Sequence, residues 1–200
     1  MATTSTKGGT ASVPSLRSTG LWVALLAGAV VAVYAVVTGG NDSSNPNAPT
    51  PAGTVTFSEP NRNHVTGTVQ YDHTPPAGGN HNSIWLNCGV YTQPVVDENA
   101  VHSLEHGGVW ITYQPSLPAD QVAILKRTVQ SHYGGGDRYV ILSPYPGQPA
   151  PVMATAWGNQ LSLQSASDPR VAGFIEHFRE GPQDLERGAP CSGGVGKPSG

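Results

Sequence analysis

The feature that most restricts how this chain can fold is an apolar run near its N-terminus. Residues 21–37 contain no charged side chain and are almost all apolar. At about 1.5 Å per residue, a helix of this length is near the lower limit for crossing a hydrocarbon core of about 30 Å. Trp22 and Tyr34 lie near the two ends of the run, where amphipathic rings favour the membrane interface. The run therefore predicts a transmembrane helix over residues 21–38.

The charges around this helix predict its orientation. Lys7 and Arg17 precede the run, and the first charged residues after it are Asp42 and Glu59. The positive-inside rule then places the N-terminus in the cytoplasm and the rest of the chain outside the membrane. A cleaved signal peptide is the alternative, but the run is longer than the usual apolar core of such a peptide and no clear cleavage site follows it. We expect an uncleaved signal anchor, and hence a single-pass protein of the cell membrane with an extracytoplasmic C-terminal domain.

Composition divides the rest of the chain into two tails, a linker and one folded domain. Residues 1–20 are rich in Thr, Ser and Gly and predict a disordered cytoplasmic tail, whereas residues 39–53 predict a Pro/Asn/Ser linker. The extracytoplasmic domain is predicted over residues 54–191, with a flexible tail over residues 192–200. The formal net charge of −3 gives no reason to expect nucleic-acid binding, which usually needs a basic surface.

The pattern within the domain predicts an α+β fold. Strands are predicted at residues 54–58, 64–71, 109–115, 138–145 and 151–158. A short helix is predicted at residues 99–107, and two longer amphipathic helices at residues 117–136 and 168–181. Residues 73–95 contain too many Gly, Pro and Asn for a regular element and predict a long ordered loop. The order predicts a small, mainly antiparallel sheet with two packed helices, and a ferredoxin-like arrangement is one version of it.

Histidines gather in one part of this domain and predict a metal site. Five of the seven lie within one stretch of the chain, at His64, His73, His81, His102 and His106. In the segment H-S-L-E-H, His102 and His106 are four residues apart and share one face of the short helix, so they can bind one tetrahedral ion. His73 and His81 flank T-P-P-A-G-G-N, a loop that can fold toward this helix. We expect these four histidines to be ligands, with Cys88 as a further candidate.

Glu105 opens a second interpretation. The spacing H-x-x-E-H is the reverse of the H-E-x-x-H zinc-protease signature, in which the Glu activates water. On this interpretation Glu105 is the general base of a hydrolase. The predicted helix is only about two turns long and the domain is far smaller than such proteases, so proteolysis is not favoured. A third interpretation is a non-catalytic envelope interaction module whose histidines are structural.

Cys88 and Cys191 are the only cysteines of the chain. Both lie in the predicted extracytoplasmic part, where an oxidising compartment permits a disulfide. A disulfide would exclude Cys88 as a ligand, and disulfide, metal binding and free thiols all stay open. If a metal is bound, imidazoles suit zinc and copper, and a thiolate would favour zinc or Cu(I). Metal affinity should then fall as the pH drops through about 6.5, where imidazoles become protonated.

The segments W-L-N-C-G-V-Y and H-S-L-E-H-G resemble the core of a known family. Together with T-P-P-A-G-G-N-H, they are similar to the domain-of-unknown-function family 3105, of the membrane-anchored actinobacterial type. The resemblance continues through V-I-L-S-P-Y-P-G and A-T-A-W-G and covers about residues 54–191. It departs from the usual loop where Gly78 and Gly79 replace Ser-Gly. The family name implies no activity, so the resemblance supports the extent of the domain and says nothing of a reaction.

Overall fold

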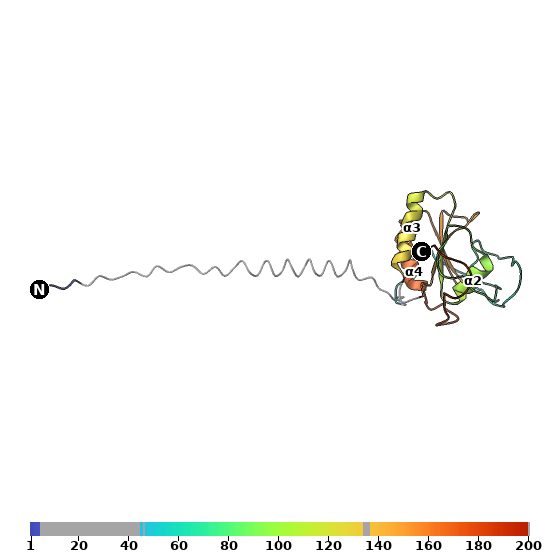
Figure 1. Ribbon diagram of the computed structural model, residues 1–200, viewed down its shortest axis with the longest axis horizontal. Coiled ribbons are helices and arrows are strands. Elements are labelled where there is room, and N and C mark those ends of the chain that lie inside the picture. Colours follow the sequence, from blue (N-terminus) through green and yellow to red (C-terminus); the bar gives the residue numbers. More distant parts are fainter. Residues whose placement is uncertain (5–44, 46, 134–136, 200) are drawn as a thin grey trace. The chain divides into compact units, whose positions relative to one another are not determined.

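The computed structural model describes residues 1–4, 45, 47–133 and 137–199. The predicted transmembrane helix at residues 21–38 therefore lies outside the described residues, as do most of the predicted tail and linker. Within the described ranges, no helix is both long enough and apolar enough to span a membrane. Residues 41–200 form one compact unit, which contains every element labelled in Figure 1.

A six-stranded mixed sheet forms the centre of this unit. Its strands are β1 (Val55–Thr56), β2 (Gly89–Val90), β3 (Val109–Tyr113), β4 (Val140–Pro144), β5 (Val152–Ala156) and β6 (Asn159–Leu163). Their order across the sheet is β1-β6-β5-β3-β4-β2. β4 pairs in parallel with both β3 and β2, whereas β3–β5, β5–β6 and β1–β6 are antiparallel. The central strand β3 thus joins the parallel part of the sheet to the antiparallel part.

Three helices of the described chain cover the two faces of the sheet. They are α2 (Asp97–Glu105), α3 (Ala119–Ser131) and α4 (Arg170–Phe178). Leu125 of α3 and Phe174 of α4 belong to the same core cluster as Ile111 of β3, on one face of the sheet. Trp110, the neighbour of Ile111 in β3, faces the other way and shares a second cluster with Val101 of α2. Because both faces are covered, all five residues of β3 are buried, which explains its almost continuous apolar sequence.

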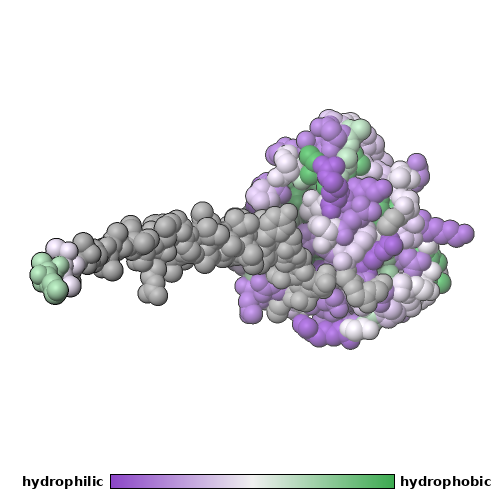
Figure 2. All heavy atoms as spheres, turned by 60° about the vertical axis from the view of Figure 1, so that its left-hand side comes forward, coloured by the Kyte–Doolittle hydropathy of each residue, from purple (hydrophilic) through white to green (hydrophobic). Residues whose placement is uncertain are grey.

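The same layering is visible in the figures. In Figure 1, α3 and α4 lie on one side of the strands and α2 lies on the other. Figure 2 turns the α3 and α4 side of the molecule forward and shows a mainly hydrophilic face with small apolar patches. This surface is expected for amphipathic helices that direct their apolar sides to the sheet.

The α+β prediction is confirmed, but its ferredoxin-like version is wrong. β3 and β4 are joined through α3 and lie side by side in parallel, so they form an undivided β–α–β unit. Ferredoxin-like folds are built instead from split β–α–β units. Among the described residues, three helices rather than two pack on the sheet, because the short helix of the H-S-L-E-H segment also buries Val101 and Leu104.

One predicted strand is absent among the described residues. Of residues 64–71, only His64 takes part in a bridge, with His81, and no strand forms there. Gly67 has a φ of +87°, which turns the chain. The backbone N–H of Val69 donates to the carboxylate of Glu98 at 2.8 Å instead of to a neighbouring strand. These contacts make the segment an ordered connection beside α2.

The C-terminal segment is fixed by a disulfide and by backbone hydrogen bonds. Cys88 and Cys191 are joined, with their Cα atoms 5.4 Å apart, so of the three alternatives for the cysteines the disulfide is the one that forms, and neither thiol is free. Beyond Cys191, where the composition predicts a flexible tail, the N–H of Val195 donates to Trp85 O at 2.9 Å. The N–H of Ser199 likewise donates to Val90 O at 2.7 Å. Residues 192–199 therefore lie along the segment that contains β2.

Candidate metal site

Helix α2 supplies most of the side chains of the candidate site. His102 and Glu105 lie in its last turn, and His106 is the residue that caps its C-terminal end. The helix is fixed to the preceding loop by Ser103, whose hydroxyl donates to Leu86 O at 2.7 Å and accepts from Leu86 N at 3.0 Å. The three polar side chains are therefore presented by an element whose position is set by buried hydrogen bonds.

Two glycines turn the chain sharply from α2 into β3. Gly107 has a φ of +83°, a backbone conformation that favours glycine. A Cβ atom on Gly108 would lie 2.5 Å from the carbonyl oxygen of Ser103, so only glycine fits there without movement of the backbone. The double glycine of the H-S-L-E-H-G-G motif thus allows the tight turn between α2 and β3, and this turn leaves His106 at the end of the helix.

Three buried imidazoles share one arrangement, in which a backbone carbonyl lies within hydrogen-bond distance of each Nδ1 atom. The pairs are His81 with Gly79 O at 2.8 Å, His102 with Asn82 O at 2.6 Å, and His106 with Pro190 O at 2.8 Å. Because a carbonyl oxygen only accepts hydrogen bonds, each Nδ1 carries the hydrogen. Each neutral ring then has its lone pair on Nε2, which is the nitrogen free to bind a metal.

The Nε2 atoms of His102 and His106 lie 2.9 Å apart. Burial lowers the pKa of His102 to about 4, and His106, His81 and His64 act in the same direction, against the carbonyl of Asn82. His102 is therefore neutral at pH 7, and its Nε2 lone pair faces the Nε2 atom of His106. Either a proton on His106 or a metal ion beside both atoms makes this contact favourable.

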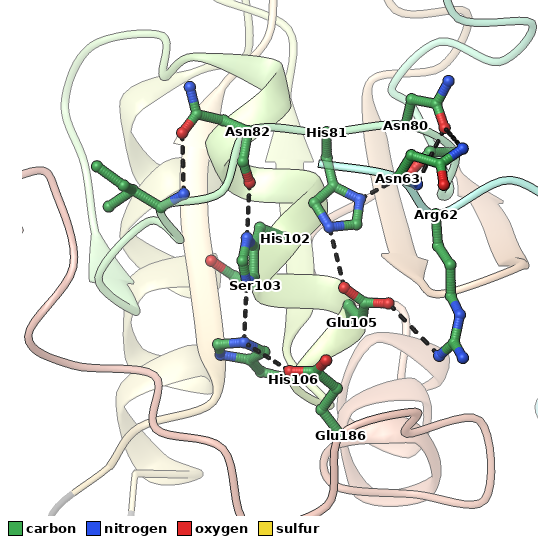
Figure 3. Close-up of polar contacts among 12 residues, drawn as sticks. Arg62, Asn63, Asn80, His81, Asn82, His102, Ser103, Glu105, His106 and Glu186 are labelled. Atoms are coloured by element: carbon green, nitrogen blue, oxygen red, sulfur yellow. Dashed lines mark hydrogen bonds and ion pairs between the residues drawn. The ribbon is translucent and has the colours of Figure 1, made fainter. Parts of the chain in front are cut away.

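His81 and Glu105 form the other half of the site. His81 is fully buried, and its Nε2 atom lies 2.9 Å from Oε2 of Glu105 without making a hydrogen bond. The other carboxylate oxygen of Glu105 lies 3.7 Å from Nη1 of Arg62. Figure 3 shows the two halves side by side, with His102 and His106 following one another along α2 and His81 directed at Glu105. A buried nitrogen without a hydrogen bond is unusual in proteins and needs an explanation, for which an ion bound between His81 and Glu105 is a candidate.

These side chains define two donor groups that share one histidine. The inner group is His64, His81, His102 and Glu105, and the outer group is His102, His106 and Glu186. Within each group the donor atoms lie within 4.8 Å of one another. Bonds of 2.0–2.1 Å in a tetrahedral zinc site place neighbouring donors about 3.3–3.4 Å apart, so modest side-chain movements suffice to close either group around an ion.

The structure brings together four of the residues predicted from the sequence and separates two. His81, His102, His106 and Glu105 all belong to these groups. His73 belongs to neither, because its ring stacks on Phe57 with 3.7 Å between the ring centroids and its Nε2 lies 3.5 Å from Glu59 Oε1. Cys88 is held in the disulfide and is not available as a ligand. The loop of residues 73–81 thus delivers only its second histidine to α2.

Two residues of the groups were not among the predicted ligands. His64 stands in the histidine-rich stretch, and its place there was the available signal. Its ring stacks on His102 with 4.8 Å between the centroids. No sequence pattern pointed to Glu186 as a ligand, since it lies in an irregular segment far from the other donors in the chain. Its Oε2 atom is 3.4 Å from Nε2 of His106.

Comparison with known proteins gives one match. A family model described as "Protein of unknown function (DUF3105)" matches residues 64–193, a range that contains both donor groups and both cysteines. No curated protein and no solved structure matches the chain.

Proposed function

The chain belongs to the DUF3105 family, and we propose that it is a membrane-anchored protein whose extracytoplasmic unit binds a zinc or copper ion. The observation that carries the metal proposal is the set of three buried imidazoles with Nδ1 fixed by carbonyls. Such carbonyl partners are typical of metal-binding histidines. The membrane anchor rests on the apolar run at residues 21–37 and on the charges beside it. The disulfide fits an oxidising compartment.

The inner group is the set of donors that best holds the ion. Three imidazoles and one carboxylate fill a tetrahedral shell, and the negative charge of Glu105 offsets part of the charge of a divalent ion. An ion there would also coordinate the buried Nε2 atom of His81, which makes no hydrogen bond and whose polar contact is the 2.9 Å approach to Oε2 of Glu105. His81, His102 and Glu105 are each 3% exposed or less, which favours retention of an ion over access by a substrate.

The donor atoms also restrict which ion fits. All are imidazole nitrogens or carboxylate oxygens, and the disulfide removes the thiolate that would favour Cu(I). Imidazole suits both zinc and copper. Zn²⁺ and Cu²⁺ are therefore the ions to test.

Metal content and affinity of the full chain test this proposal. The chain is purified in detergent without chelator, stripped, and titrated with Zn²⁺ or Cu²⁺ by calorimetry, with elemental analysis of the product. We expect one ion per chain. His102→Ala should weaken binding by more than the roughly 10–100-fold typical for loss of a partner outside the coordination shell, because a ligand is removed.

His73→Ala is the matched control for this experiment. It removes a histidine of the same stretch that lies outside both donor groups, so affinity should equal that of the unmodified chain. Circular dichroism of each variant confirms folding. The proposal is wrong if the unmodified chain retains no stoichiometric ion, or if His73→Ala weakens binding as much as His102→Ala does.

A further inference from the structure

The two donor groups cannot both hold an ion in full. They share His102, whose Nδ1 atom is engaged with Asn82 O, so only its Nε2 lone pair is free for coordination. One lone pair binds one ion. The groups are thus alternative positions for a single ion, one on each side of the same nitrogen.

We propose that the outer group of His102, His106 and Glu186 is an entry position, through which an ion passes to the inner group. This inference rests on the proposed function, because it assumes that the inner group holds the ion at equilibrium. It assigns a role to Glu186 that differs from that of a permanent ligand.

Exposure distinguishes the two groups. The side chain of Glu186 is 46% exposed, whereas that of Glu105, the carboxylate of the inner group, is 3% exposed. A hydrated cation that approaches from solvent therefore meets the carboxylate of Glu186 before that of Glu105. Nε2 of His106 lies 3.4 Å from Oε2 of Glu186, so a buried imidazole nitrogen lies next to the carboxylate of this exposed side chain.

The backbone holds Glu186 in place for this role. The N–H groups of Leu185 and Glu186 both donate to the carbonyl of Glu105 at 3.3 Å, and that of Glu186 also donates to Oδ1 of Asp184 at 3.0 Å. The backbone of Glu186, which belongs to the outer group, is thus hydrogen-bonded to the backbone of Glu105, which belongs to the inner group, at the end of α2. Figure 3 shows Glu186 beside His106 at one end of this arrangement and His81 at the other.

Transfer between the groups is a ligand exchange in which His102 stays bound. Glu105 replaces Glu186 as the carboxylate, and His81 replaces His106 as an imidazole. His64 then completes the inner shell of four donors. Each ligand that leaves is replaced by one of the same kind, and the oxidation state of the ion does not change.

His64 provides the competing route. It is the exposed member of the inner group, so an ion could arrive there without contact with Glu186. The two routes differ in one consequence. Removal of the Glu186 charge slows loading only if ions enter through the outer group.

The test is the rate of zinc loading into the metal-free full chain in detergent. Stopped-flow mixing with Zn²⁺, followed with a zinc indicator dye, gives the loading rate, and calorimetry gives stoichiometry and the dissociation constant. For Glu186→Gln we expect a loading rate about tenfold lower, because an anionic group at the entry no longer attracts the ion. The stoichiometry and the dissociation constant should stay unchanged, so release slows by the same factor.

Glu176→Gln is the matched control. Glu176 is 53% exposed and lies 3.7 Å from Nε2 of His132, so it is another exposed Glu–His pair but outside both groups. Its loading rate should equal that of the unmodified chain. An unchanged rate in Glu186→Gln overturns the inference while the proposed function stands. A weaker dissociation constant in that variant also overturns it, because Glu186 would then be a permanent ligand. Failure of the unmodified chain to bind zinc overturns both.

Discussion

His102 is the residue at which the contacts of the site meet. The ring centroids of His106, His64 and His81 lie 4.5, 4.8 and 4.9 Å from its own. Its Nδ1 atom is fixed by a carbonyl and its Nε2 atom is shared by both donor groups. Loss of His102 therefore affects both positions of an ion, whereas loss of His81 or His106 affects one of them.

At the same scale, Gly108 limits which sequences can form the site. We expect Gly108→Ala to lower the free energy of unfolding by about 2–3 kcal/mol, because the added Cβ would lie 2.5 Å from the carbonyl oxygen of Ser103 and the backbone must shift. Urea unfolding followed by circular dichroism measures this change.

Gly173→Ala in α4 is the control, since its Cβ would meet only Pro51 Cγ at 3.7 Å. That variant should be unchanged or more stable by up to about 1 kcal/mol, owing to the higher helix propensity of Ala. Equal losses of stability in both variants would show that the close approach at Gly108 is not the cause.

At the scale of elements, the docking of α2 on the loop before it determines the site. Ser103 is completely buried and makes two hydrogen bonds with the backbone of Leu86. We expect Ser103→Ala to lower the free energy of unfolding by about 1–2 kcal/mol, because the carbonyl of Leu86 loses its donor in a buried place. The measurement is again urea unfolding.

Ser131→Ala serves for comparison. The hydroxyl of Ser131 donates to Thr128 O near the exposed end of α3, so its loss should change the free energy by no more than about 0.5 kcal/mol. A loss for Ser103→Ala as small as that for Ser131→Ala would mean that this hydrogen bond does not fix α2.

The elements that the sequence predicted well are those with a strong local pattern. The amphipathic pattern of residues 117–136 predicted α3, and the runs V-I-L-S-P and V-M-A-T-A predicted β4 and β5. Residues 64–71 carry β-branched side chains but pair with no strand, because Gly67 turns the chain there. β6 was not predicted, since N-Q-L-S-L is partly polar and is buried through its partner strand β5.

The site was predictable only where its residues are close in the chain. H-S-L-E-H gives His102, Glu105 and His106 at helical spacing, whereas His81 was predicted only together with His73, because both flank the same loop. Only the folded path of that loop shows which of the two histidines reaches α2, because it packs the ring of His73 on Phe57. Glu186 could not be found, because only the folded C-terminal segment brings it to His106.

At the scale of the whole molecule, one covalent bond ties the C-terminal segment to the region of the site. Cys191 follows Pro190, whose carbonyl fixes His106, and Cys88 lies close to Trp85, whose ring centroid is 5.1 Å from that of His106. The disulfide spans a sequence separation of 103 residues. A cross-link over so long a loop lowers the conformational entropy of the unfolded chain and thereby stabilises the folded state.

Reduction of this disulfide should lower the free energy of unfolding by up to about 4.7 kcal/mol, the chain-entropy value for a loop of about 100 residues. Urea unfolding of the full chain with and without a phosphine reductant measures the change. The double variant Cys88→Ser, Cys191→Ser should behave like the reduced chain and should not respond to the reductant. Coincident unfolding curves for the oxidised and reduced chains would contradict this prediction.

The neighbouring positions of Pro190 and Cys191 also link the orientation of His106 to a redox-sensitive bond. The Nδ1 atom of His106 lies 2.8 Å from the carbonyl oxygen of Pro190, which is 84 residues further along the chain. The next residue, Cys191, is joined to Cys88, and its carbonyl also accepts a hydrogen bond from the backbone N–H of Cys88 at 2.8 Å. Reduction of the disulfide would leave this segment held by hydrogen bonds, so the oxidation state of the two cysteines bears on how rigidly the outer group is presented.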